Sequence, residues 1–166
     1  MVWSFVIHFT LVILIMSVGN GAKNIITDEM AHALTLAAKR GVDVRIITPG
    51  IPDKKLVYNV TRSFYHELVK DGVRIYEWTP GFCHAKMSVA DDCMATCGTI
   101  NLDYRSLYHH FENGCFMADC DAVQDIRNDL YETMKECREV TEKYRTGRSA
   151  YLRLGQLFMR LFAGLL

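Results

Sequence analysis

The residues best suited to chemistry lie between His84 and Asn101. Lys86 follows His84 by two positions, and Gly98 and Thr99 come shortly before Asn101. In an extended segment, side chains two residues apart point to the same face. An imidazole that can attack phosphorus or carry a proton would then lie beside a permanent cation. This arrangement is suited to reactions at a phosphate ester.

Each of these residues has a natural task in such a reaction. His84 would be the nucleophile, because a phosphohistidine divides one difficult displacement into two easier ones. Lys86, Asn101 and the Thr99 hydroxyl would stabilise charge that develops on the phosphate oxygens, and Gly98 permits close backbone approach. No metal is expected, since lysine and amide donors can replace an ion and no C-x-x-C pair occurs. A core or surface histidine is the alternative for His84, but its two companions favour a site.

The spacing H-x-K-x4-D-x6-G-[ST]-x-N from His84 to Asn101 resembles the HKD motif of the phospholipase D superfamily. Two stretches resemble bacterial cardiolipin synthase more narrowly, namely residues 98–106 with 111–113, and residues 40–50 with 52–55. The similarity extends over about residues 28 to 166. Such synthases carry two motifs on one chain and this chain carries one, so it resembles only their C-terminal half.

The resemblance implies roles for three further residues. Glu112 would hydrogen-bond His84 and fix its tautomer, although a surface glutamate is the alternative. Asp91 would form a structural ion pair. Arg105 would bind a second phosphate or a lipid head group, or would instead be the partner of Asp91.

The activity implied by the resemblance is phosphatidyl transfer. One phosphatidylglycerol would donate its phosphatidyl group to His84, and a second would attack the phosphohistidine to give cardiolipin, without a cofactor. The second motif would come from a homodimer partner or from a separate N-terminal half; otherwise the chain is an inactive fragment. A homodimeric phosphodiesterase that cuts nucleic acid and a non-catalytic membrane-binding scaffold are rival interpretations. The balance of 19 basic and 19 acidic residues gives no support to nucleic acid.

Strands and helices must alternate to position these residues. Periodicity and turn signals predict helices at residues 28–40, 55–70 and 121–140, and strands at 42–47, 73–78, 84–90, 94–99 and 112–117. This order predicts a phospholipase D-like α/β sandwich with a mixed sheet over residues 23–147. We expect the six cysteines to be reduced and mostly buried in its core.

The two ends of the chain are apolar. Residues 1–22 carry no charge and are long enough for a membrane helix, although a buried strand is the alternative. Lys23, Lys39 and Arg40 would keep the catalytic part in the cytoplasm. Residues 148–166 read as an amphipathic helix with three arginines, which would lie on an anionic bilayer or pack on the core. Together these features predict a location at the bacterial cytoplasmic membrane.

Overall fold

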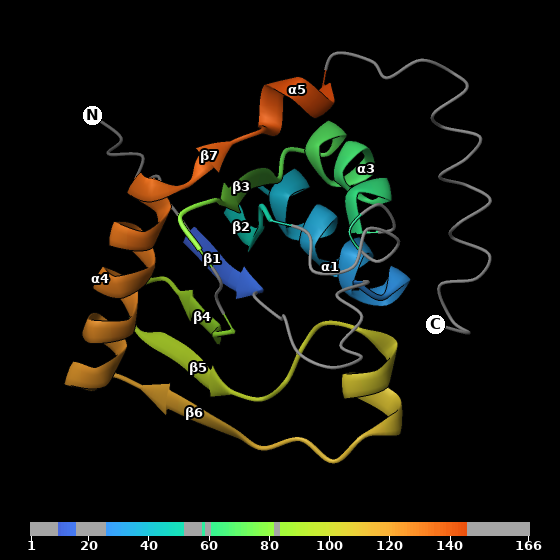
Figure 1. Cartoon of the computed structure of the whole chain (residues 1–166). Coiled ribbons are helices and arrows are strands. Elements are labelled where there is room, and N and C mark those ends of the chain that lie inside the picture. The colour runs from blue at the N-terminus through green and yellow to red at the C-terminus, as the bar shows by residue number, and fades with distance from the viewer. Residues whose placement is uncertain (1–9, 16–25, 52–57, 59–60, 82–83, 146–166) are drawn as a thin grey trace, which may run out of the picture.

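The computed structural model describes residues 10–15, 26–51, 58, 61–81 and 84–145 (Figure 1). Within them, seven strands form one sheet in the order β6-β5-β4-β1-β2-β3-β7. The strands are β1 (Thr10–Ile15), β2 (Asp43–Pro49), β3 (Arg74–Trp78), β4 (Lys86–Ala90), β5 (Met94–Gly98), β6 (Gly114–Ala118) and β7 (Arg138–Glu139). The helices are α1 (Asp28–Lys39), α3 (Tyr65–Lys70), the π-helical turn η1 (Arg105–His109), α4 (Asp121–Glu136) and α5 (Thr141–Arg145).

The sheet is mixed, as predicted. β1, β2 and β3 run parallel, while β4, β5 and β6 form an antiparallel meander and β7 pairs antiparallel with β3. Lys86, the first residue of β4, lies opposite Ile15, the last residue of β1. His84 and Lys86 therefore lie at the end of the sheet that is formed by the C-terminal ends of the parallel strands. Ligands commonly bind at this end of an α/β sheet.

Helices cover the two faces of the sheet, with α4 on one side and α1 and α3 on the other (Figure 1). Each face of the sheet has its own hydrophobic core, and residues of β2 contribute to both. Val44 and Ile46 pack with Leu34 of α1, whereas Ile47 packs with Leu130 of α4. This alternation is what a strand with both faces buried requires. The predicted α/β sandwich is confirmed.

The helix predicted over residues 1–22 is wrong for residues 10–15, which form β1. This strand lies at the centre of the sheet, between β2 and β4. A short, continuously apolar run also suits a central strand that is covered on both faces, which was the alternative prediction. In the part of the chain that the structure describes, no helix is long and apolar enough to cross a bilayer. The segments 1–9 and 148–166 lie outside the described residues.

Two predicted helices are also corrected. The helix expected at 121–140 ends at Glu136, because the next residues pair with β3 as β7 and the Val140 amide donates to the Ile75 carbonyl at 2.9 Å. The stretch over 55–70 was expected to be one helix. Within it, Tyr58 and residues 61–63 are helical, Phe64 forms a buried turn, and α3 begins only at Tyr65. The helix expected at 28–40 is present as α1, capped by Thr27, whose hydroxyl accepts from the Met30 amide at 3.2 Å.

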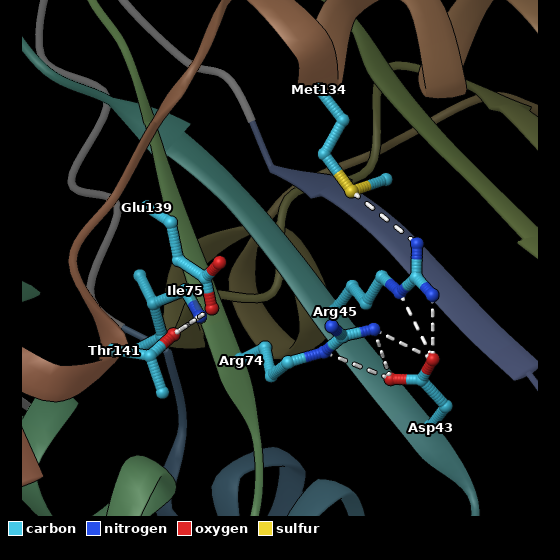
Figure 2. A network of polar contacts seen from close by, with 7 residues as sticks. All are labelled: Asp43, Arg45, Arg74, Ile75, Met134, Glu139 and Thr141. Atoms are coloured by element: carbon cyan, nitrogen blue, oxygen red, sulfur yellow. Dashed lines mark hydrogen bonds and ion pairs between the residues drawn. The ribbon is translucent and has the colours of Figure 1, made fainter.

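Polar contacts join β2 to β3, and β3 to β7 and α5 (Figure 2). Asp43 on β2 accepts hydrogen bonds from Arg45 and from Arg74 of β3, each with a closest distance of 2.7 Å. Partial burial raises the pKa of Asp43, but these hydrogen bonds outweigh burial and leave the pKa below its usual value. Thr141 accepts from the Ile75 amide at 3.0 Å and donates to Glu139 at 2.9 Å. The two Thr141 contacts hold β7 and α5 against β3.

Candidate functional site

His84 and Lys86 form the centre of the site. The Lys86 side chain is buried, and its Nζ lies 2.8 Å from His84 Nε2 and 3.0 Å from the His84 carbonyl oxygen. Partial desolvation lowers the pKa of the His84 imidazole, and the positive charge of Lys86 lowers it further. The imidazole is therefore neutral at pH 7, with its Nε2 lone pair directed at the Lys86 ammonium group.

Thr99 and Glu112 meet just beyond the ends of β5 and β6. The Thr99 hydroxyl donates to the Glu112 carboxylate and accepts from the Asn113 amide at 2.9 Å, while the Thr99 amide donates to the Asn113 carbonyl at 2.8 Å. The Thr99 hydrogen bond is the main cause of a lowered pKa at Glu112, which Ser106 and the charges of His110 and Lys86 reinforce. Glu112 is thus an anion near Lys86. A direct hydrogen bond from His84 to Glu112 stays a prediction.

Asn101 is held by a residue that the sequence did not single out. Its Nδ2 donates to Ser106 Oγ at 3.3 Å, and its buried Oδ1 has no hydrogen-bond partner among the described residues. Ser106 is buried in η1, and its amide donates to Asp103 Oδ1 at 2.7 Å. Burial raises the pKa of Asp103. The adjacency of Ser106 to Arg105 in the synthase-like run was the only sequence signal for this support.

Gly98 has a structural reason to be glycine. A Cβ atom there would lie 2.6 Å from Gly114 Cα and would also collide with the Asn113 carbonyl oxygen. The close approach that the sequence predicted at Gly98 is between the backbones of β5 and β6. The two glycines bring the strand ends together and so set the distance between Thr99 and Glu112.

Asp91 and Arg105 lie apart from each other. Asp91 is in the turn between β4 and β5, with a left-handed φ of 50°. Gly98 ends β5 at the opposite end of this hairpin, and the chain continues from there to Arg105 in η1 (Figure 1). This arrangement argues against the ion pair between Asp91 and Arg105. It leaves Arg105 exposed at the end of the sheet that carries Thr99, where the phosphate role stays a prediction.

A cleft of about 340 Å³ opens beside Lys86. It is lined by residues of β4 and β5, by Met30 of α1 and by Leu107 of η1, and most of its walls are apolar or small. The apolar side chains lining it are Met30, Met87, Ile100, Leu102 and Leu107. In the described residues no group of three or more His, Cys, Asp or Glu side chains is placed to hold a metal ion. A buried cation beside an apolar cleft suits an amphiphilic anion.

Similar proteins were found at the level of family, sequence and fold. The family model for the cardiolipin synthase, PLD-like domain matches residues 12–134. A Streptococcus mutans protein described only as uncharacterized is 50% identical over 142 residues, which are 86% of this chain and 31% of that protein. Cardiolipin synthase 2 of Bacillus cereus is 35% identical over 139 residues, which are 84% of this chain and 27% of the synthase. The chain thus spans less than a third of the length of these relatives.

Solved structures share the fold at low sequence identity. The phospholipase D family member Nuc from Salmonella typhimurium superposes with a TM-score of 0.66 at 15% identity, over 78% of this chain and 80% of that one. Phosphatidylserine synthase from Haemophilus influenzae superposes with a TM-score of 0.63 at 16% identity, over 94% of this chain and 39% of that one. Because the family model matches residues 12–134 and the synthase relative matches 84% of the chain, the chain belongs to the phospholipase D-like domain family of cardiolipin synthases.

Proposed function

We propose that the chain is the half of a phosphatidyltransferase that supplies the nucleophile, with His84 attacking the phosphorus of phosphatidylglycerol. The observation that carries this proposal is the 2.8 Å contact between Lys86 Nζ and the neutral His84 imidazole. A bound phosphate oxygen would take over the Lys86 donor and release the Nε2 lone pair for attack. The same lysine would then stabilise the charge that builds on the phosphate oxygens.

The reaction proceeds in two displacements. Nε2 of His84 forms a bond to phosphorus as the bond to the departing glycerol oxygen breaks, and that oxygen takes up a proton. A hydroxyl of a second phosphatidylglycerol then loses its proton and attacks the same phosphorus, the P–N bond breaks, and cardiolipin leaves. Thr99, Asn101 and Arg105 would bind phosphate oxygens, and the Glu112 carboxylate would orient His84. No nucleotide or other cofactor is consumed.

The proton for the leaving glycerol would come from a second motif, supplied by another copy of this chain or by a separate N-terminal half. Exposed aromatic side chains beside the site support a covering partner. Phe111, next to Glu112 in the chain, is 101% exposed, and Phe116 in the middle of β6 is 67% exposed. Large apolar side chains in such positions are typical of protein interfaces. If no partner exists, the chain is an inactive remnant of a synthase.

The apolar cleft beside Lys86 supports a lipid as the substrate. A phosphodiester of nucleic acid has a sugar and a charged neighbour on each side of phosphorus, and it gains little from apolar walls. A phospholipid can place apolar substituents in the cleft while its phosphate contacts Lys86. Because such a substrate is part of the bilayer, binding it would hold the chain at a membrane surface.

The test is cardiolipin formation from phosphatidylglycerol vesicles by the purified chain, with phosphate-labelled donor lipid. His84→Ala should abolish both the cardiolipin and the acid-labile phosphohistidine, and His32→Ala on the exposed surface of α1 is the matched control. If His84 becomes labelled but no cardiolipin forms, the chain carries out the first displacement and the second displacement requires the partner. A folded chain that forms neither species, with and without the N-terminal half of a relative, would contradict the proposal.

A second candidate is a self-associating phosphodiesterase for nucleic acid. It is favoured by one observation, that the fold of the chain matches 80% of Nuc, a phospholipase D family member. Cleavage of single-stranded DNA, together with binding that weakens steeply with salt, would select it over lipid transfer.

A further inference from the structure

The cysteines of this chain are not distributed as core residues. Their apolar surroundings in the sequence predict that they are mostly buried, but Cys97, Cys115 and Cys120 are exposed, and Cys93 and Cys137 are half-buried. This expectation is wrong because β6 is the edge strand of the sheet and β5 is its neighbour, and the side chains of Cys97 and Cys115 on these two strands are exposed. The three exposed cysteines are free thiols.

Two of the exposed thiols are direct neighbours across a pair of strands. Cys97 on β5 is the register partner of Cys115 on β6. Register partners in an antiparallel ladder project to the same face of the sheet, with Cα atoms about 4.5–5.5 Å apart. A disulfide requires a Cα separation of about 4.4–6.8 Å, so the backbone already lies within its range.

The register also shows which kind of pair this is. The Thr99 amide donates to Asn113 and the Asp119 amide donates to Cys93, so the hydrogen-bonded pairs occur at alternate positions and include Cys97 with Cys115. Cβ atoms are farther apart in such pairs than in the alternate ones. Closing a disulfide therefore needs a small inward movement of the two strands, which would make the bond easy to reduce.

We propose that Cys97 and Cys115 form a site of reversible oxidative modification, in which peroxide converts the two thiols to a cross-strand disulfide. The thiolate of one cysteine attacks a peroxide oxygen, the O–O bond breaks, and a sulfenic acid and one water form after protonation. The second thiol attacks the sulfenic sulfur, the S–S bond forms, and a second water leaves. Two thiols are oxidised and one peroxide is reduced, and thiol reductants reverse the change.

The position of the pair gives this modification a consequence for the candidate site. Cys97 lies two residues before Thr99, and Cys115 lies three residues after Glu112. A covalent link between them would fix the pairing of the strand ends that hold these two residues together. The inference does not depend on the proposed lipid chemistry, because it rests on the strand register and on exposed thiols.

The experiment treats the folded chain with one equivalent of hydrogen peroxide and maps disulfides by mass spectrometry of non-reduced peptides. We expect one dominant link, Cys97 to Cys115, with loss of two hydrogen atoms and full reversal by dithiothreitol. Cys97→Ser and Cys115→Ser should each abolish the link, while Cys120→Ser, which changes another exposed thiol, should leave it intact.

The chain contains its own control at the other end of the same strand pair. Cys93 is opposite Asp119, so Cys120 is one position out of register with it. A link between Cys93 and Cys120 as abundant as the expected one, or the same pattern of links in urea-unfolded chain, would overturn the proposal. Amide hydrogen exchange at Thr99 should slow in the oxidised protein. Faster exchange would show that β5 and β6 separate when the disulfide forms. It would overturn the proposal that the disulfide forms within an intact β5–β6 ladder.

Discussion

At the scale of single residues, the site depends on a buried lysine that faces a neutral histidine. Lys86 is only 8% exposed, and its Nζ lies 2.8 Å from Nε2 of the imidazole. Burial and the neighbouring positive charge both oppose protonation of His84. The cation that would bind phosphate therefore also keeps the nucleophile unprotonated.

This coupling predicts a pH effect that can be measured. His84 has a lowered pKa, so its nucleophilic form is lost only as the pH falls below the usual histidine value of about 6.5. Lys86→Met removes the repulsion, and the pKa of His84 should rise. NMR titration of the imidazole resonances measures this shift directly. The exposed Lys135→Met should leave the pKa unchanged, and a lower His84 pKa in Lys86→Met would contradict the explanation.

A second buried charge has a structural function. Glu77 of β3 is fully buried and accepts from Arg62 and, at 2.7 Å, from Arg138 of β7. Glu77→Gln keeps the shape but leaves Arg62 without its ion-pair partner. The free energy of unfolding should fall by roughly 3–5 kcal/mol, the usual cost of breaking a buried pair. Urea denaturation measures it, with the exposed Glu132→Gln as a control of little effect. Equal stability of the two variants would show that Glu77 is dispensable.

At the scale of elements, the hairpin of β5 and β6 sets the geometry of half the site. Its strand ends approach closely because Gly98 faces Gly114, and beyond them Thr99 and Glu112 meet. The sequence showed the glycine and the two polar residues. It did not show that they meet across strands, because contacts between strands depend on the register of the whole meander.

This geometry predicts the effect of adding one methyl group. Gly98→Ala would place a Cβ 2.6 Å from Gly114 Cα, so the strands must move apart. We expect a loss of roughly 1–3 kcal/mol in the free energy of unfolding, as for other overpacked sites. Gly81→Ala is the matched control, because no atom lies within 4 Å of the added methyl. Thermal melts of the two variants that coincide would refute the close approach.

At the scale of the whole molecule, β1 is the element that joins the two kinds of pairing. It pairs in parallel with β2 and antiparallel with β4, and so brings the start of β4 to the edge where the parallel strands end. The chain still carries only one His-Lys pair of this spacing. In the proposed function, a two-histidine reaction takes its second histidine from outside these residues, and we propose that the partner covers the face marked by Phe111 and Phe116.

Mixing chains tests whether that second chain is another copy. Equal amounts of wild type and His84→Ala, at constant total protein and with exchange of partners, should retain about a quarter of the activity if each site uses two His84 residues. About a half is expected if each chain acts alone. Mixing with Lys135→Met, which is remote from the site, should cost nothing. Activity of about a half would exclude the two-copy site.

The sequence by itself determined the family and the alternation of strands and helices, and it predicted the residues that the site would use. These features are encoded locally, because periodicity, turn residues and motif spacing extend over only a few residues. The tertiary structure alone decided that residues 10–15 form the central strand, that residues 138–139 join the edge of the sheet, that Ser106 supports Asn101, and that Cys97 faces Cys115. Each of these depends on pairing between segments distant along the chain, where one apolar run suits a helix or a strand equally until its neighbours are in place.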